Sequence, residues 1–131
     1  LKEKVAAKTW SRMLSFNKFV HSAPVIVAFV LEKPKVITQI GGRIKHKEYP
    51  LIDIGIAAEH FCLQATEEGL ATCMLGWFDE KAVGKLLHIP KQKTIGLLIT
   101  LGYHNYDRIP DKRRKDMKEV VSFNAYGRGE N

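Results

Sequence analysis

The sequence has few of the residue patterns that carry metal or covalent chemistry. Its two cysteines, Cys62 and Cys73, each lie in an apolar run and spell neither a CxxC redox pair nor a zinc ligand set, so we expect reduced, packed thiols. The five histidines are scattered without an H-E-x-x-H pair, and no G-x-S-x-G nucleophile elbow occurs. These absences argue against a metal site and against nucleophilic catalysis, and they leave no acid or base side chain to name as catalytic.

Long apolar runs are also missing. No stretch of about 18 uninterrupted apolar residues occurs, because Asp53, Glu59 and His60 interrupt the longest candidate. A signal peptide is absent as well, so we expect no membrane span and a reducing, cytoplasmic location. The chain begins at Leu1 and enters a helical pattern without a lead-in, and we expect it to be part of a longer protein.

Positive charge is what the sequence has in excess. The formal net charge is +7, and the basic residues gather near the start and again over residues 108–118. Such a balance suits nucleic acid, an anionic surface or an anionic small ligand. Neither group is interleaved with aromatic residues, as a platform for single-stranded nucleic acid would be, so we expect no nucleic-acid partner. With 131 residues and 45% hydrophobic content, we expect residues 1–131 to form a single domain.

Two apolar runs predict strands. Residues 25–31, VIVAFVL, and residues 94–101, TIGLLITL, are continuous runs of β-branched and other apolar residues, which are typical of strands buried on both faces. Residues 119–123, EVVSF, are a candidate for a short final strand. Helices and strands mix without a clean βαβ repeat, so the sequence predicts an α+β fold in which helices cover a sheet.

Three segments predict helices. Residues 2–20 carry apolar residues at loosely helical spacing, which indicates one or two short amphipathic helices. A helix over residues 50–69 begins at Pro50 and stops at Gly69, and it is apolar almost all round, so it needs a central position or a subunit interface to cover it. Asp79 is the expected N-cap of a third helix, with His88 at its C-terminal end. Residues 35–49 have no sustained period and predict a surface lid.

The turn Leu75-Gly76 is the strongest candidate for a ligand site. Glycine permits close approach of a ligand to the backbone, and the strand-like residues up to Met74 would hold the turn in place. Taken alone, the turn is better explained as an ordinary connection from strand to helix, with Trp77 and Phe78 as core anchors. The basic segment 111–115, taken alone, is a solvated run of charge.

Five blocks of the sequence resemble the nitroreductase family of flavin enzymes. They lie in order between about residues 19 and 126, and they read DIGIAAEHFCLQATEEGLATC from Asp53, then LGWFD, VGKLLHIP, LLITLGY and KRRKDMKEVV. The resemblance implies an FMN-dependent oxidoreductase that takes hydride from NADH or NADPH and passes electrons to a nitroaromatic, quinone or related small-molecule acceptor. The flavin itself would carry the redox chemistry.

The resemblance also implies which residues bind the cofactor. It places Met74, Leu75 and Gly76 at the reactive edge of the flavin, with the Leu75 N–H directed at the flavin N5 atom. Lys112 and Arg114 match the family's basic pair near the flavin phosphate, a role that suits an ammonium and a guanidinium group.

A homodimer follows from the same resemblance. FMN would lie at the subunit interface beside the helix over residues 50–69, within a mixed sheet flanked by helices, and a C-terminal extension from Glu119 would pack on the partner subunit. Tyr49, Trp77 or Phe78 would line the acceptor pocket. The family's N-terminal arginine-rich and N-x-Q-P-W-like segments do not occur in residues 1–131, so we expect a domain without its N-terminal FMN-binding segments.

Two alternatives stay open at this point. One is a specialised flavin protein of the same fold, of the dehalogenase or flavin-degrading type. The other is a non-catalytic basic binding module, or an inactive fragment, that binds an anionic partner.

Overall fold

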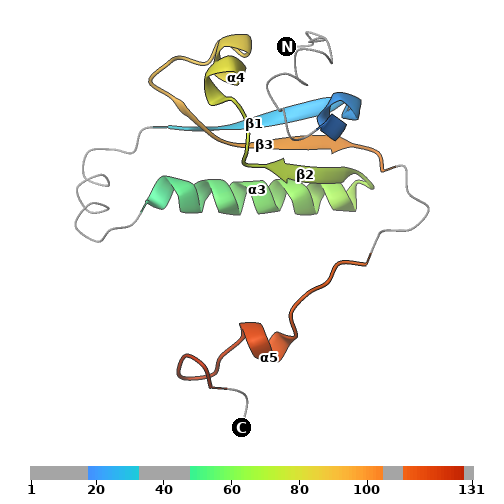
Figure 1. The fold of residues 1–131 in the computed structure, drawn as a ribbon, viewed down its shortest axis with the longest axis vertical. Helices are drawn as coiled ribbons and strands as arrows, with labels where there is room; N and C mark the ends of the chain where they lie inside the picture. Colours follow the sequence, from blue (N-terminus) through green and yellow to red (C-terminus); the bar gives the residue numbers. More distant parts are fainter. Residues whose placement is uncertain (1–17, 33–47, 105–110, 129–131) are drawn as a thin grey trace.

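The computed structural model describes residues 18–32, 48–104 and 111–128. They form a three-stranded sheet with helices on both faces and a C-terminal extension that runs away from this body (Figure 1). The helices expected before residue 18 and most of the lid expected over residues 35–49 lie outside the described residues.

The sheet has the strand order β1-β3-β2, and both pairings are antiparallel. Its strands are β1 (Val25–Leu31), β2 (Ala71–Leu75) and β3 (Thr94–Gly102). The central strand β3 buries Ile95, Leu98, Ile99 and Thr100, as expected for a strand covered on both faces. The same expectation was wrong for β1, where none of the seven described residues is fully buried. Within the described sheet β1 is an outer strand, so a neighbouring strand shields it along one edge only.

Alternation along the strands separates the two faces of the sheet. Leu75 pairs with Leu98, and both join Val83 and Val20 in the buried core cluster. The other face meets helix α3 (Tyr49–Glu67), where the rings of Phe29 and Phe61 lie edge to face with centroids 6.0 Å apart. Helix α3 therefore covers one face, while helix α4 (Glu80–Leu86) and the 3₁₀ helix η1 (Lys18–Ser22) cover the opposite one.

The bounds of α3 follow local sequence rules. Pro50 stands in its first turn, where a missing N–H costs nothing. At the other end Gly69 adopts φ +71°, and the N–H groups of Gly69 and Leu70 donate to the carbonyls of Thr66 and Ala65 at 3.0 and 2.8 Å. This is the Schellman arrangement that closes a helix with a left-handed glycine. The predicted stop at Gly69 is thus confirmed, and the predicted start at Pro50 differs from the observed start at Tyr49 by one residue.

Close contact between α3 and β3 depends on Gly96. A Cβ added to Gly96 would fall on Cδ1 of Ile54 in α3. The missing side chain lets the helix sit directly against the central strand. Of the residues of α3, all of which the structure describes, Ala58 and Ala65 are buried, and the face turned away from the sheet stays exposed.

Helix α4 is fixed at both ends. The Asp79 side chain accepts a hydrogen bond from the Ala82 N–H at 3.0 Å, which confirms the predicted N-cap. At the other end His88 takes φ +53°, and the N–H groups of His88 and Ile89 donate to the carbonyls of Lys85 and Gly84. The helix thus ends in the same Schellman arrangement as α3, with histidine in the place that glycine usually holds.

The C-terminal extension contains helix α5 (Met117–Val120). Asp116 and Glu119 form a capping box, in which the Asp116 side chain accepts from the Lys118 N–H and the Glu119 side chain accepts from the Asp116 N–H. The final strand predicted over residues 119–123 is therefore wrong, because the D-x-x-E sequence favours a helical turn there. Every residue from 111 to 128 is exposed.

Among the described residues, no helix has the length and apolar character needed to span a membrane.

Candidate functional site

The turn that follows β2 stands at a well-fixed point of the body. Leu75 is the last residue of β2 and is only 4% exposed, with its side chain in the core beside Val83 and Leu98. Met74 points to the opposite face and is 43% exposed. Within the described sheet β2 pairs along one edge only, so backbone groups along its other edge face away from β3. The backbone of the predicted flavin-facing residues is therefore held in place by the core, and the edge of β2 that faces away from β3 is unpaired within the described sheet.

Gly76 has free space beside its Cα atom. A Cβ built there would meet no atom within 4 Å among the described residues, and the backbone of Gly76 does not adopt a left-handed conformation. The fold itself therefore does not require glycine at this position. The open space leaves room for a ligand to approach the backbone.

The two aromatic residues after Gly76 behave differently. Phe78 packs against the core cluster, as expected for a core anchor. Trp77 is 73% exposed, so the expectation that it anchors the core was wrong. The exposed indole of Trp77 thus lies next to the open backbone of Gly76. Tyr49, at the start of α3, is half-buried.

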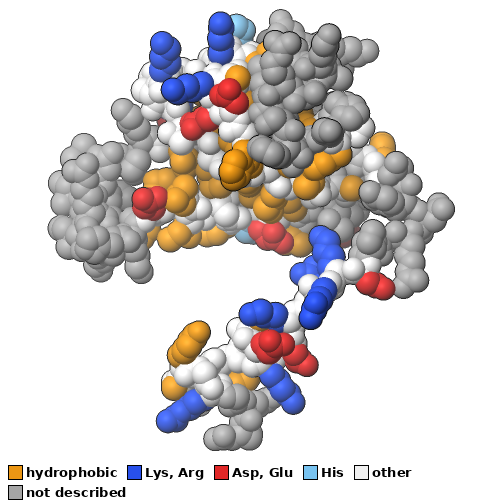
Figure 2. Space-filling model, in the orientation of Figure 1, with side chains coloured by type: hydrophobic (Ala, Val, Ile, Leu, Met, Phe, Trp, Pro, Cys, Tyr) orange, Lys and Arg blue, Asp and Glu red, His pale blue; other side chains and the backbone are white. Residues whose placement is uncertain are grey.

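Lys112 and Arg114 lie in the C-terminal extension, with their side chains exposed. Figure 2 shows Lys and Arg side chains along this extension. The chain reaches it from the end of β3 at Gly102, which pairs with Ala71 at the start of β2. Leu75 stands four residues further along β2, about 13 Å away at the usual rise per residue of a strand. Residues 105–110 lie outside the described residues, and the turn and the basic pair lie on different parts of the structure, the turn on the body and the pair on the extension (Figure 1).

Two hollows that the sequence did not reveal lie among the described residues. A groove of about 1050 Å³ lies between α4 and the start of β3, and four lysines border it: Lys81, Lys85, Lys91 and Lys93. A smaller hollow of about 390 Å³ is bordered by Cys73, Thr100 and Tyr103. The lysines are spread over 13 positions of sequence with no motif, and only the turn between α4 and β3 brings them together.

Both cysteines are free thiols. Cys62 is half-buried in α3, whereas Cys73 is exposed, so the expectation of a packed thiol was wrong for Cys73. Residues along β2 point alternately to the two faces, and the face that carries Cys73 is only partly covered at that end.

Comparison with known proteins supports the family resemblance. Residues 2–103 match the family model described as the nitroreductase family. A protein of Bacillus subtilis (strain 168), "Putative NAD(P)H nitroreductase MhqN", is 35% identical over 69 residues, which are 52% of this chain and 34% of that protein. The alignment thus spans about a third of that relative.

Solved structures share the fold. A nitroreductase family protein from Clostridium novyi NT superposes with a TM-score of 0.64 at 26% identity, covering 95% of this chain and 66% of that one. An FMN-dependent nitroreductase from Clostridium difficile R20291 superposes with a TM-score of 0.65 at 19% identity, covering 92% of this chain and 68% of that one. The predicted α+β fold, a sheet flanked by helices, is confirmed.

Proposed function

Because the chain belongs to the nitroreductase family, we propose that it is the FMN-binding part of an oxidoreductase that takes hydride from NADH or NADPH and reduces a small-molecule acceptor, such as a nitroaromatic or a quinone. The observation that carries this proposal is the open backbone at Gly76, which directly follows a residue fixed in the core. FMN, when bound, supplies the redox chemistry.

The turn fits the edge of a flavin in two respects. The Leu75 side chain is buried and its strand is paired with β3, so the backbone N–H groups at the turn are held in position before any ligand arrives. A donor that is already oriented loses little conformational entropy on binding. The space beside Gly76 gives a planar ring access to that backbone. Exposed Trp77 offers an aromatic surface for the acceptor.

The basic pair fits the phosphate of FMN. Lys112 and Arg114 are exposed cations on a segment without buried residues, so their side chains are available to an anion. Arg114 presents a planar fork that suits two phosphate oxygens, and Lys112 adds a point charge. Their role is to neutralise the phosphate and to fix one end of an elongated ligand whose other end lies at the turn.

A second copy of the chain is the proposed partner. The exposed side of α3 carries large apolar residues that are more than half exposed: Leu51, Ile52, Ile56 and Leu63. Figure 2 shows hydrophobic side chains gathered along the side of the body where α3 lies. The extension adds exposed apolar residues, among them Met117, Val120 and Phe123. Patches of this kind in a monomer favour an interface, and a homodimer would cover both.

The two free thiols suit a reducing compartment such as the cytoplasm.

The visible absorption spectrum of the purified full chain tests this proposal. After reconstitution with excess FMN and removal of free flavin, we expect a flavin spectrum that bleaches when NADH or NADPH is added without oxygen. A colourless protein after reconstitution would overturn the flavin assignment. If that colourless protein instead bound anions with steep salt dependence, the basic-module alternative would take its place.

The variant Gly76→Ala gives a sharper test of the turn. Because an added Cβ meets no described atom and the backbone suits alanine, we expect the urea midpoint to stay at or slightly above that of the parent protein. The same methyl group would intrude on a ring lying against the backbone, so FMN affinity should fall. Unchanged affinity would remove the turn from the flavin site while leaving the family assignment intact.

A further inference from the structure

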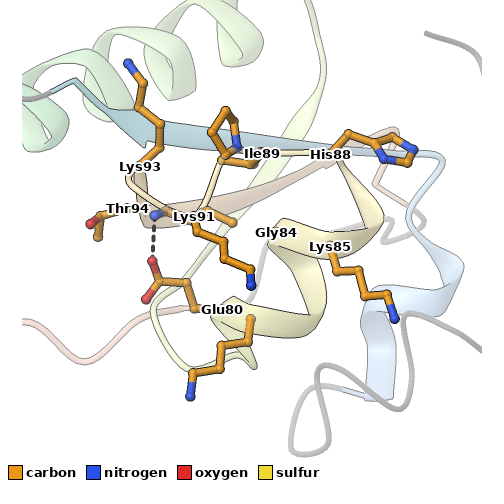
Figure 3. Close-up of a pocket in the computed structure, with 11 residues that line it drawn as sticks. Glu80, Gly84, Lys85, His88, Ile89, Lys91, Lys93 and Thr94 are labelled. Atoms are coloured by element: carbon orange, nitrogen blue, oxygen red, sulfur yellow. Dashed lines mark hydrogen bonds between the residues drawn. The ribbon is translucent and has the colours of Figure 1, made fainter.

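The groove between α4 and β3 has an unusual concentration of positive charge. Its walls carry four lysines and His88, and the carboxylate among its lining residues is that of Glu80. Figure 3 shows the Lys91 side chain lying between those of Glu80 and Lys85, over helix α4, while Lys93 and His88 point outward on either side. Lys81 and Lys85 stand four residues apart on α4 and therefore share one side of the helix.

Two carboxylates lie at or beside this groove, and each has a different partner. The Glu80 side chain accepts a hydrogen bond of 2.9 Å from the Ile95 N–H, which ties the start of α4 to β3 (Figure 3). Glu32 forms an ion pair with Lys93. No described carboxylate lies within 4.0 Å of the ammonium groups of Lys81, Lys85 or Lys91. With four lysines and the Glu80 carboxylate along its walls, the groove keeps an excess of positive charge.

The backbone that carries these lysines is fixed. The Asp79 cap holds the start of α4, and the Schellman arrangement at His88 holds its end. In the turn that follows, the Lys93 N–H donates to the Pro90 carbonyl at 2.9 Å. The backbone therefore places the four lysines around one hollow, where their like charges repel one another unless an anion lies among them. The hollow has the volume of a small-ligand site.

We propose that this groove binds a polyphosphate group, with Lys81, Lys85 and Lys91 as its principal contacts. Lysine presents a compact point charge and not a planar fork, so three lysines match a ligand whose negative charge is spread over several adjacent phosphates. A single phosphate would leave part of this charge unmatched. Ile89 and Pro90, which also border the groove, add an apolar surface beside the cations. The site lies on α4, apart from the basic pair of the extension, and does not depend on FMN.

The test measures binding of inorganic tripolyphosphate to the full chain by calorimetry. The double variant Lys85→Gln with Lys91→Gln should lose roughly tenfold or more in affinity, because two charge-assisted contacts disappear. The matched control, Lys118→Gln with Arg128→Gln, removes the same charge from the exposed extension and should change the affinity less than twofold. Both lysines of the test variant are exposed, so its thermal unfolding should match that of the parent.

Three results would overturn the proposal. They are absence of tripolyphosphate binding, equal weakening in the test and control variants, and orthophosphate binding as tight as that of tripolyphosphate. A second titration, with ATP, distinguishes a nucleotide from an inorganic polyphosphate as the ligand. Tighter binding of ATP than of tripolyphosphate would support a nucleotide whose base packs on Ile89, and equal or weaker binding would support an inorganic chain. Unchanged FMN affinity in the test variant would confirm that this groove is separate from the flavin site.

Discussion

At the scale of single residues, His88 and Gly69 form a natural pair for comparison. Both close a helix in the left-handed region, at φ +53° and φ +71°. Because only glycine adopts this region without a steric cost, His88→Gly should stabilise the protein by about 0.5–1 kcal/mol, and Gly69→Ala should destabilise it by about 1 kcal/mol. Urea unfolding midpoints measure both changes. A destabilised His88→Gly variant would mean that the imidazole makes a contribution larger than the backbone strain.

The phosphate role of Lys112 and Arg114 is tested at the same scale. Replacing both with alanine removes two charged contacts to FMN, so the affinity should fall roughly tenfold to a hundredfold. Fluorescence titration of FMN measures this directly.

The neighbouring residues give the matched control. Arg113→Ala with Lys115→Ala removes an equal charge from the same exposed segment. Equal losses in the two double variants would indicate general electrostatic attraction in place of a specific phosphate site.

Prediction from sequence was right for residues whose conformation is set by their immediate neighbours in the chain. The Asp79 cap and the Gly69 stop are decided by bonds within a few residues, and both are confirmed. The exposure of Trp77 was missed, because the direction of a side chain after a strand depends on what the rest of the fold leaves open. The lysine groove was missed for the same reason, since α4 and β3 bring its residues together in space.

At the scale of elements, the two capping aspartates should have different effects on stability. Asp79→Ala removes the bond to the Ala82 N–H and should cost about 1 kcal/mol of global stability, because Val83 of α4 is fully buried in the core. Asp116→Ala removes a cap of α5, which buries nothing, so the change should stay within about 0.5 kcal/mol. Chemical denaturation of both variants checks this. Equal costs would mean that α5 contributes to the core after all.

The elements themselves were predicted well where the apolar pattern is long. The strand over residues 25–31 matches β1, and the predicted strand over residues 94–101 differs from β3 by one residue. The error at residues 119–123 has a physical cause. Their β-branched residues favour a strand, but a strand needs a second strand to pair with. No described strand pairs with this segment, so the local capping box around Asp116 determines its structure.

At the scale of the whole molecule, the exposed side of α3 is the face that the proposed homodimer would bury. Ile56→Glu with Leu63→Glu should be tolerated by one chain, because both side chains are already more than half exposed. In the proposed homodimer the new carboxylates would be buried without partners, and the dissociation constant should rise roughly a hundredfold or more. Sedimentation equilibrium measures the change.

The control for this prediction is Gln92→Glu, which adds an exposed charge in the turn between α4 and β3, away from α3. It should leave assembly unchanged. A parent protein that stays monomeric at every concentration would contradict the proposed dimer.

The contact between Gly96 and Ile54 has a consequence for how this fold can change over evolution. The two positions share one small volume between β3 and α3, and either residue can fill it, but not both. A substitution at one position is therefore acceptable only with a compensating change at the other. Among descendants of the same ancestor, we expect chains with a side chain at position 96 to carry a shorter residue at position 54, so that the two positions co-vary.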